Sequence, residues 1–373
     1  MTRSPGLPRR GFSLAGATMD LRPVGLIQGD LAAQGCRDGI ALPLAGGPLA
    51  FTACELFLSG PDNVAIHYAA LDALTEWAGQ NGPDTAQAIS NQLESLSQQR
   101  PDFAGMSLDR SLLMGVVNVT PDSFSDGGDF FDSQAAIAHG RALVEVGVDL
   151  LDIGGESTRP GSNPTSPEEE LARVLPVIDG LAEFGIPLSI DTRRGVVVDA
   201  ALSRGASVVN DITALGDDLD AAGIVARHGA SVMLMHMRGR PRDMQAEPHY
   251  DHAPYEILQY FKDRVRACEQ AGITRDRIAI DPGIGFGKND DHNLKLLAEA
   301  GIFHGLGCAV AIGASRKSFI GRVANEDEAK SRLPGSLAAA ALAVGQGVQI
   351  LRVHDVVETR QALKILDAAI YTR

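Results

Sequence analysis

The stretch "LLMGVVNV", residues 112–119, is an apolar and β-branched run that turns polar at Asn118. Seven further runs repeat this pattern, at residues 148–155, 187–192, 206–212, 230–237, 277–283, 309–315 and 349–355. Helical patterns such as "SQAAIAHGRALVEVG" separate the runs, and several of these helices end at a glycine just before the next strand. Buried strands that alternate with helices are typical of a parallel sheet.

The number of strands selects between two parallel architectures. Eight strand–helix units over about 270 residues match the size of a (β/α)8 barrel. A doubly wound sheet usually has fewer strands and often carries a glycine-rich dinucleotide turn after the first one, and the chain shows neither feature. We therefore predict an α/β fold with a (β/α)8 TIM barrel over residues 106–373.

The first 105 residues have a different character. Residues 40–60 hold short apolar runs broken by glycine and proline, and residues 84–99 have the pattern of a helix with a polar majority. We predict that residues 1–105 form an additional small α/β or irregular module, and no chemistry is evident in it.

Charge and cysteine usage exclude several classes of partner. The net charge of −14 argues against nucleic acid or an anionic membrane as a general partner, although a local cluster of cations can still bind a small anion. The four cysteines show no CxxC pairing, as expected of free thiols in a reducing compartment. "RRGFSL", residues 9–14, resembles a twin-arginine export signal, but Asp20 and Arg22 interrupt the apolar segment that should follow. We predict a cytoplasmic protein.

Each predicted barrel strand is polar at its C-terminal end. These ends carry Asn118, Asp152, Asp191, Asn210, His236, Asp281, Ser315 to Lys317, and Arg352 with His354. Helix capping explains any single Asp or Asn, but it does not explain all eight strands, and Lys317, Arg352 and His354 are not N-cap residues. Because all these ends meet on one face of a barrel, they predict a single site there.

Two kinds of chemistry are present at that face. Asp191, Asn210 and Asp281 suit a flat heterocycle rich in N–H and C=O groups, because a carboxylate accepts two parallel N–H donors. The cationic set suits a phosphate or diphosphate and consists of Arg159, Lys317, Arg352 and His354. Asn118 offers a neutral oxygen to a Mg²⁺ that a diphosphate would hold.

Three further segments near these strand ends have simpler interpretations. "DPGIGFGKN", residues 281–289, does not fit the spacing of a P-loop, and we predict a tight turn in which Phe286 forms a wall of the pocket. His236 is expected to be structural, with Met235 beside it lining the pocket. Residues 239–254 are expected to form a solvated loop.

Seven segments together resemble the motif set of dihydropteroate synthase, and the resemblance covers residues 106–373. They are "NVTPDSFSDGG" (118–128), "DIGGESTRPGS" (152–162), "VVNDI" (208–212), "LMHMRG" (234–239), "DPGIGFGK" (281–288), "GASRKSFIG" (313–321) and "RVHDV" (352–356). The order and the strand-end positions make the match highly specific. The leading segment of about 105 residues departs from the minimal pattern of this family.

The resemblance implies a Mg²⁺-assisted transferase of folate biosynthesis. Such an enzyme condenses 6-hydroxymethyl-7,8-dihydropterin diphosphate with 4-aminobenzoate, the diphosphate leaving before the weakly nucleophilic amine attacks. Enzymes of the family are commonly homodimers, and sulfonamides compete for the 4-aminobenzoate pocket. Neither a nucleic acid nor a membrane is expected as a partner.

The resemblance also implies a role for each residue. The pterin would be bound by Asp191, Asn210, Asp281 and Lys317. The diphosphate would be contacted by Thr158, Arg352, Val353 through its backbone, and His354, with Asn118 on Mg²⁺. The 4-aminobenzoate pocket would contain Phe124, Arg159, Pro160, Lys317 and Ser318. Asp126 would help to close that pocket, and Phe124 and Pro160 would sandwich the benzene ring once the two mobile loops close.

Two alternatives share part of this pattern. A pterin-binding methyltransferase that acts with a corrinoid protein would keep Asp191, Asn210 and Asp281 but would not need the first loop or "SRKS", residues 315–318. A non-catalytic pterin-binding relative would be expected to lack the cations of the site. The chain retains all of these features.

Overall fold

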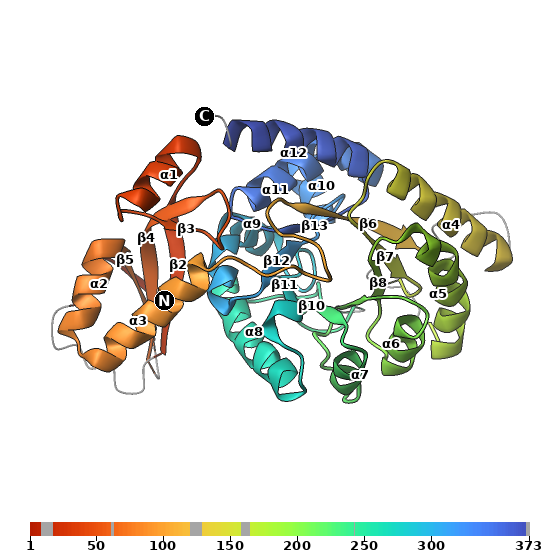
Figure 1. Cartoon of the computed structure of the whole chain (residues 1–373), viewed down its shortest axis with the longest axis horizontal. Helices are drawn as coiled ribbons and strands as arrows, with labels where there is room; N and C mark the ends of the chain where they lie inside the picture. The colour runs from red at the N-terminus through yellow and green to blue at the C-terminus, as the bar shows by residue number, and fades with distance from the viewer. Residues whose placement is uncertain (9–17, 61–62, 120–128, 158–164, 242, 371–373) are drawn as a thin grey trace.

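The structure is a computed structural model that describes residues 1–8, 18–60, 63–119, 129–157, 165–241 and 243–370. A small sheet module precedes a closed barrel of eight parallel strands (Figure 1). Several predictions fall on residues outside the described ranges: the "RRGFSL" segment, Phe124, Asp126, Thr158, Arg159 and Pro160.

The barrel strands follow one another in chain order around the closed sheet, which confirms the predicted (β/α)8 architecture. They are β6 Leu112–Asn118, β7 Leu150–Gly154, β8 Leu188–Asp191, β9 Val208–Asp211, β10 Ser231–Met235, β11 Ile278–Asp281, β12 Ala309–Ile312 and β13 Ile350–Val353. Each neighbouring pair is parallel, so the polar C-terminal ends lie on one face.

Helices surround the barrel (Figure 1). They are α4 Asp129–Glu145, α5 Pro167–Leu181, α6 Gly195–Leu202, α7 Ala221–His228, α8 Ala253–Gln270, α9 Asp290–Ala298, α11 Leu333–Val344 and α12 Val356–Ile370, with one additional helix, α10 Ser318–Ala324, after β12. Short 3-10 helices are η1 Ala182–Phe184, η2 Arg275–Arg277, η3 Ala300–Leu306 and η4 Ala329–Arg332. Within the described ranges, no helix has the length and apolar character needed to cross a membrane.

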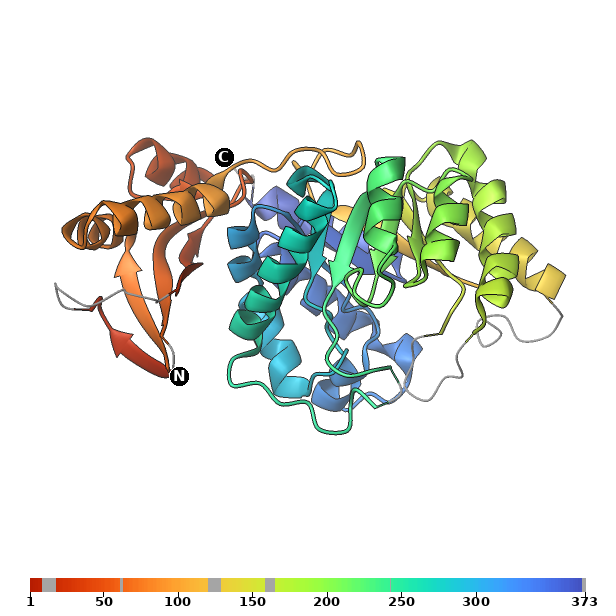
Figure 2. The same cartoon turned by 90° about the horizontal axis from the view of Figure 1, so that it is seen from below.

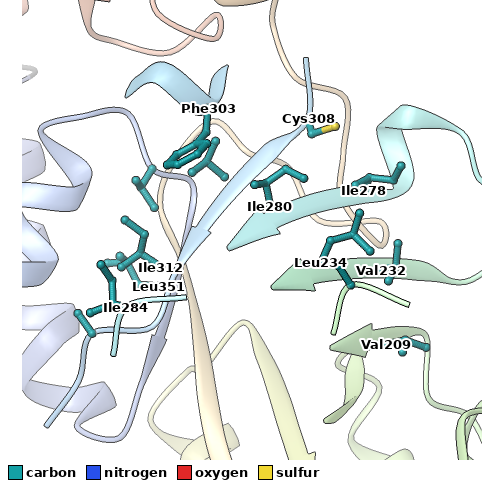
Figure 3. Packing of buried hydrophobic residues seen from close by; sticks show 14 of the residues in the cluster. Val209, Val232, Leu234, Ile278, Ile280, Ile284, Phe303, Cys308, Ile312 and Leu351 are labelled. Carbon is teal, nitrogen blue, oxygen red and sulfur yellow. The ribbon is translucent and has the colours of Figure 1, made fainter. Parts of the chain in front are cut away.

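Alternation of side chains along each strand divides the barrel into an outer and an inner layer. Outward residues such as Val232, Leu234 and Ile280 belong to the same apolar core as Phe303 of η3 and pack beneath the helices (Figure 3). Inward residues such as Leu150 and Met233 fill the N-terminal half of the interior. The inward positions two residues later are largely polar, and they build the site at the C-terminal half.

The N-terminal module is an α/β unit. Its sheet has the order β1-β5-β4-β2, with β3 paired to β4. The strands are β1 Thr2–Pro5, β2 Thr18–Ile27, β3 Leu42–Pro43, β4 Ala50–Ser59 and β5 Val64–Ala70, and the helices are α1 Gly29–Arg37, α2 Leu71–Gln80 and α3 Pro83–Ser97. The predicted helix over residues 84–99 is confirmed as α3.

The segment after α3 ties the module to the barrel, and it runs across the end of the barrel opposite the site (Figure 2). The Arg100 guanidinium donates hydrogen bonds to the Cys308 and His304 carbonyls, at 3.0 and 2.8 Å. The Phe103 ring is fully buried among the inward residues that close the N-terminal end of the barrel, including Leu112 and Ile350. Phe103 therefore belongs to the barrel core although it precedes the predicted boundary at residue 105.

Replacement of Phe103 by alanine is expected to lower the free energy of unfolding by about 3–5 kcal/mol, because a fully buried ring leaves a cavity that the surrounding strands cannot fill. Urea denaturation followed by circular dichroism measures this loss. The KM values for the two substrates that the resemblance implies should stay near those of the wild type, since the ring lies at the end of the barrel opposite the site. A loss below about 1 kcal/mol would contradict the assignment of Phe103 to the barrel core.

Candidate active site

A half-buried arginine joins three strands at the centre of the barrel mouth. The Nε of Arg352, on β13, donates to Oδ2 of Asp152 on β7 at 2.6 Å. Its Nη2 donates to Oδ2 of Asp191 on β8 at 2.9 Å. The guanidinium side chain is 21% exposed and Asp152 is fully buried. The acidic and cationic residues predicted from the strand ends thus lie in direct contact.

This arrangement changes the protonation of both partners. Burial raises the pKa of Asp191 to about 7; the nearby Asp152 carboxylate adds to this rise, and Arg352 opposes it. For Arg352 itself, burial lowers the pKa, but Asp152 and Asp191 outweigh burial and keep the guanidinium charged. One cation therefore faces two carboxylates, and Asp191 is the carboxylate that titrates near neutral pH.

Two more predicted residues complete the polar wall. Nδ2 of Asn210, on β9, donates to Oδ2 of Asp152 at 3.1 Å, and Asn210 is buried. Oδ1 of Asp281, on β11, accepts the Gly283 amide at 2.8 Å. Burial raises the pKa of Asp281, although the bond from Gly283 and the charge of Lys317 act in the opposite direction.

Lys317 reaches the same space from the loop after β12. Its Nζ donates to the Ile284 carbonyl at 2.5 Å and lies 4.2 Å from the centre of the Phe286 ring. Burial lowers the pKa of Lys317 to about 8, with Asp281 opposing this shift. Lys317 and Phe286 therefore lie against each other at the C-terminal face of the barrel, where the charge of Asp281 also acts on Lys317.

The turn after β11 requires glycine where it approaches the end of β10. Gly283 has φ +70°, and a Cβ there would lie 2.0 Å from the His236 carbonyl oxygen. Lys288 anchors the far end of this turn, with no exposed surface. Its Nζ donates to the Phe286 carbonyl at 2.8 Å, to Nδ1 of His236 at 3.0 Å and to the His236 carbonyl at 3.3 Å. His236 is thus part of the scaffold of the turn.

The predicted solvated loop over residues 239–254 is in fact packed in its second half. Tyr250 is buried, and its hydroxyl donates to the Gly287 carbonyl at 3.1 Å. The Arg238 guanidinium stacks 4.5 Å from the Tyr250 ring centre. His252 is buried as the N-cap of α8. The prediction was wrong here because Tyr250 packs against the turn after β11, where alternating glycines leave the backbone to be covered by a neighbouring segment.

His354 follows β13 and borders the cationic part of the site. Burial, with a contribution from Arg352, lowers the pKa of His354 to about 3, so the imidazole is neutral at pH 7. Its backbone amide donates to Oγ of Ser315 at 3.2 Å, and its Nδ1 lies 3.1 Å from the same oxygen. A neutral imidazole can still donate one hydrogen bond to a phosphate oxygen.

Asn118 ends β6 and is half-buried at the mouth. Asn118 and Asp191 both lie close to Gly154. A Cβ atom placed on Gly154 would be 3.7 Å from Oδ1 of Asn118 and 3.6 Å from Oδ2 of Asp191. The described residues contain no cluster of three or more His, Cys, Asp or Glu side chains that could bind a metal. One neutral oxygen at this place fits a Mg²⁺ whose other ligands are diphosphate oxygens and water.

The remaining predicted residues occupy different positions around the mouth. Met235 points inward at the end of β10 and is buried. Val353 packs its side chain into the outer core, so only its backbone faces the site. Ser318 is exposed at the start of α10. Five predicted residues, Phe124, Asp126, Thr158, Arg159 and Pro160, lie outside the described ranges.

Two residues acquire a role that the strand-end pattern did not assign. Asp152 connects Arg352 with Asn210, and its Oδ1 is buried without a hydrogen-bond partner among the described residues. The alternation along the strand could have indicated that Asp152 points into the barrel, since it lies two residues after the inward Leu150. Lys288 gave no such signal, because its burial depends on contacts with His236 that are distant in sequence.

Comparison with known proteins gives a consistent assignment. The family model described as "Pterin binding enzyme" matches residues 114–354. Dihydropteroate synthase of Escherichia coli (strain K12) is 44% identical over 271 residues, which are 71% of this chain and 95% of that protein. The structure of Xanthomonas albilineans dihydropteroate synthase with 4-aminobenzoic acid has a TM-score of 0.68 at 46% identity, covering 72% of this chain and 97% of that one.

A second structure of the Xanthomonas albilineans enzyme, in complex with 7,8-dihydropteroate, has a TM-score of 0.65 at 44% identity and covers 71% of this chain and 95% of that one. The extent and identity of these matches, together with the residues at the mouth of the barrel, show that the chain belongs to the dihydropteroate synthase family of pterin-binding enzymes.

Proposed function

We propose that this protein condenses 6-hydroxymethyl-7,8-dihydropterin diphosphate with 4-aminobenzoate to give 7,8-dihydropteroate and diphosphate. The observation that carries this proposal is the contact between Arg352 and the carboxylates of Asp152 and Asp191. Arg352, which we propose to bind the diphosphate, lies within hydrogen-bonding distance of Asp191, which we propose to bind the pterin, and this proximity supports the proposal. The alternative corrinoid-dependent methyltransferase releases no diphosphate and binds no 4-aminobenzoate, so it would not need the segment "SRKS", residues 315–318.

Pterin binding would replace contacts that the free protein makes internally. Asp191 would accept two N–H donors from the heterocycle in place of the Arg352 guanidinium, while Asn210 and Asp281 would bind neighbouring polar atoms of the ring. Phe286 and Met235 would cover its faces. The Arg352 guanidinium, released from Asp191 but still held by Asp152, would then be free to turn toward the diphosphate.

Loss of diphosphate would be the first chemical step, because the aromatic amine is a weak nucleophile. The C–O bond between the methylene and the diphosphate breaks, and the dihydropterin ring delocalises the positive charge. Asp191 and Asp281 stabilise that charge, while Arg352 and His354 stabilise the departing oxygens. Bound through Asn118, Mg²⁺ would supply additional stabilisation of the diphosphate.

The amine would then form a C–N bond with the cationic methylene and release one proton to solvent. Lys317 and Ser318 border the expected 4-aminobenzoate position, and the resemblance adds Thr158, Arg159 and Pro160 of one loop and Phe124 and Asp126 of the other. Excluding water from this position matters, because water would trap the cation as the alcohol. We propose that sulfonamides compete at the same place.

The exposed surface supports a homodimer. Helix α11 has no charged side chain, and Pro334, Ala338 and Leu342 lie exposed one turn apart along it. Leu342 is 56% exposed. An uncharged helix face of this kind is typical of a subunit interface. We propose that two copies associate through α11, and the four free cysteines are consistent with a cytoplasmic location.

Diphosphate release that depends on 4-aminobenzoate is the test of the proposed activity. In a coupled spectrophotometric assay, Arg352→Gln is expected to lower kcat roughly 100- to 1000-fold, as loss of a charge-stabilising donor does in other enzymes. Arg110→Gln is the matched control, since Arg110 pairs with Asp149 just before β7, at the end of the barrel opposite the site. Release that does not depend on 4-aminobenzoate would contradict the proposal.

The affinity for the pterin diphosphate is expected to fall as the pH drops through about 7, where Asp191 gains a proton. A protonated carboxyl cannot accept two N–H donors, so affinity falls by up to about tenfold per pH unit below this value. Calorimetric titrations across this range measure the effect. The Asp191→Asn variant should bind the pterin diphosphate weakly, with an affinity that does not vary with pH. If this variant kept the pH dependence of the wild type, Asp191 would be rejected as the titrating group.

Replacement of Leu342 by glutamate is expected to convert the dimer into a monomer, because it places a charge in an apolar interface. Analytical ultracentrifugation measures the mass. Leu219→Glu is the control, since Leu219 is 93% exposed on a different part of the barrel. A wild-type protein that sediments as a monomer, or a Leu342→Glu variant that stays dimeric, would refute the α11 interface.

A further inference from the structure

We infer that the N-terminal module positions the pterin pocket, through Phe57 and the Arg22–Glu55 ion pair, which hold the start of α8 and the loop before it. The inference rests on the proposed pterin site and concerns residues outside the part of the chain that the family model matches, residues 114–354. The module would thereby contribute to substrate binding without contacting the substrate.

The first contact is aromatic. Phe57 of β4 is fully buried and belongs to the apolar core of the barrel rather than that of the module. Its ring stacks on Tyr255 at 4.9 Å between ring centres, with only 5° between the planes. The same ring meets His252 edge-on at 5.4 Å. One side chain of the module thus packs against both the N-cap and the first turn of α8.

The second contact is a buried group of charges. Arg22 of β2 pairs with Glu55 of β4, with Nη2 and Nε 2.8 and 3.0 Å from Oε2. Nε of Arg22 also lies 3.9 Å from Oε2 of Glu299, beside η3. The same Glu299 oxygen is 3.4 Å from Nε2 of His252. Because a buried carboxylate needs a compensating charge, Arg22 stabilises the Glu299 carboxylate that lies beside His252.

The His252 ring lies between these charges and the first turn of α8. Burial lowers the pKa of His252 to about 4, so the ring is neutral at pH 7. Its Nδ1 accepts the Tyr255 amide at 3.4 Å as the N-cap of α8, which leaves the ring proton on Nε2, toward Glu299. The His252 backbone amide donates to Oε1 of Glu256 at 2.9 Å. The orientation of this N-cap therefore depends on groups that the module holds.

The loop before α8 transmits this position to the pocket. Tyr250 lies two residues before His252, and its hydroxyl donates to the Gly287 carbonyl at 3.1 Å. Gln245 donates to the Gly285 carbonyl from the same loop. Between these glycines lies Phe286, whose ring faces Nζ of Lys317. A shift of the loop would therefore move two walls of the pterin pocket.

A different contact of the same interface offers a matched control. Asp20 of β2 is buried, and it pairs with Lys262 and accepts a hydrogen bond from Gln259 at 2.9 Å. Both partners lie in the middle of α8, one to three turns beyond its N-cap. Loss of this contact weakens docking of the module without touching the loop that leads to the glycine turn.

The experiment compares the full-length variants Phe57→Leu, Arg22→Gln and Asp20→Asn with wild type. Phe57→Leu and Arg22→Gln are expected to raise the KM for the pterin diphosphate roughly three- to tenfold, since small displacements of positioning groups have effects of this order or larger. The KM for 4-aminobenzoate should stay within about twofold. Asp20→Asn should lower the melting temperature and leave both KM values unchanged.

Hydrogen exchange of the free protein provides a readout that requires no substrate. Amides of residues 244–252 and 283–288 are expected to exchange faster in Phe57→Leu than in Asp20→Asn when both are equally destabilised. Equal exchange in the two variants, or a rise in both KM values together, would overturn the inference. If the wild type released no diphosphate, the proposed function would fail, whereas the exchange comparison would still decide the role of the module.

Discussion

The geometry of the site depends on one guanidinium placed among three strands at the barrel mouth. Arg352 can lie there because Asp152 and Asp191 surround it with negative charge. Leaving the cation unpaired in such a place would cost several kcal/mol. Because this one cation faces two carboxylates and the pKa of Asp191 is raised to about 7, the free site is prepared to exchange an internal cation for a ligand that donates hydrogen bonds.

The barrel could be predicted from the sequence because local pattern and fold agree. Each strand is short, apolar and followed by a polar residue, and the parallel arrangement gathers those residues on one face. The same reasoning predicted that Asp191, Asn210, Asp281, Lys317 and Arg352 would share that face, and the structure places them there. The reasoning did not find that Arg352 and Asp191 are partners, because strand ends predict a shared face and not which side chains bond across it.

Other features depend on contacts between distant segments, so no local pattern reveals them. Lys288 resembles a surface lysine in sequence, yet it is fully buried because His236 and a backbone carbonyl satisfy its three donors. Tyr250 and His252 lie in a polar stretch of sequence, yet both are buried. Tyr250 packs against the glycine turn, and His252 packs against Phe57 of the module. The sequence of the module shows mainly apolar runs broken by glycine and proline, which did not reveal its sheet. Its α3 helix could be predicted because residues 84–99 have a helical pattern.

The position of Phe103 has a consequence for how the chain folds during synthesis. This ring leaves the ribosome before any barrel strand, but its socket includes Leu112 of the first strand and Ile350 of the last. The socket is complete only when β13 closes the sheet, so the segment after α3 must wait, with its aromatic ring unburied, for more than half of the protein to be translated. Such a late, long-range closure predicts slow folding and a nascent chain that benefits from chaperones.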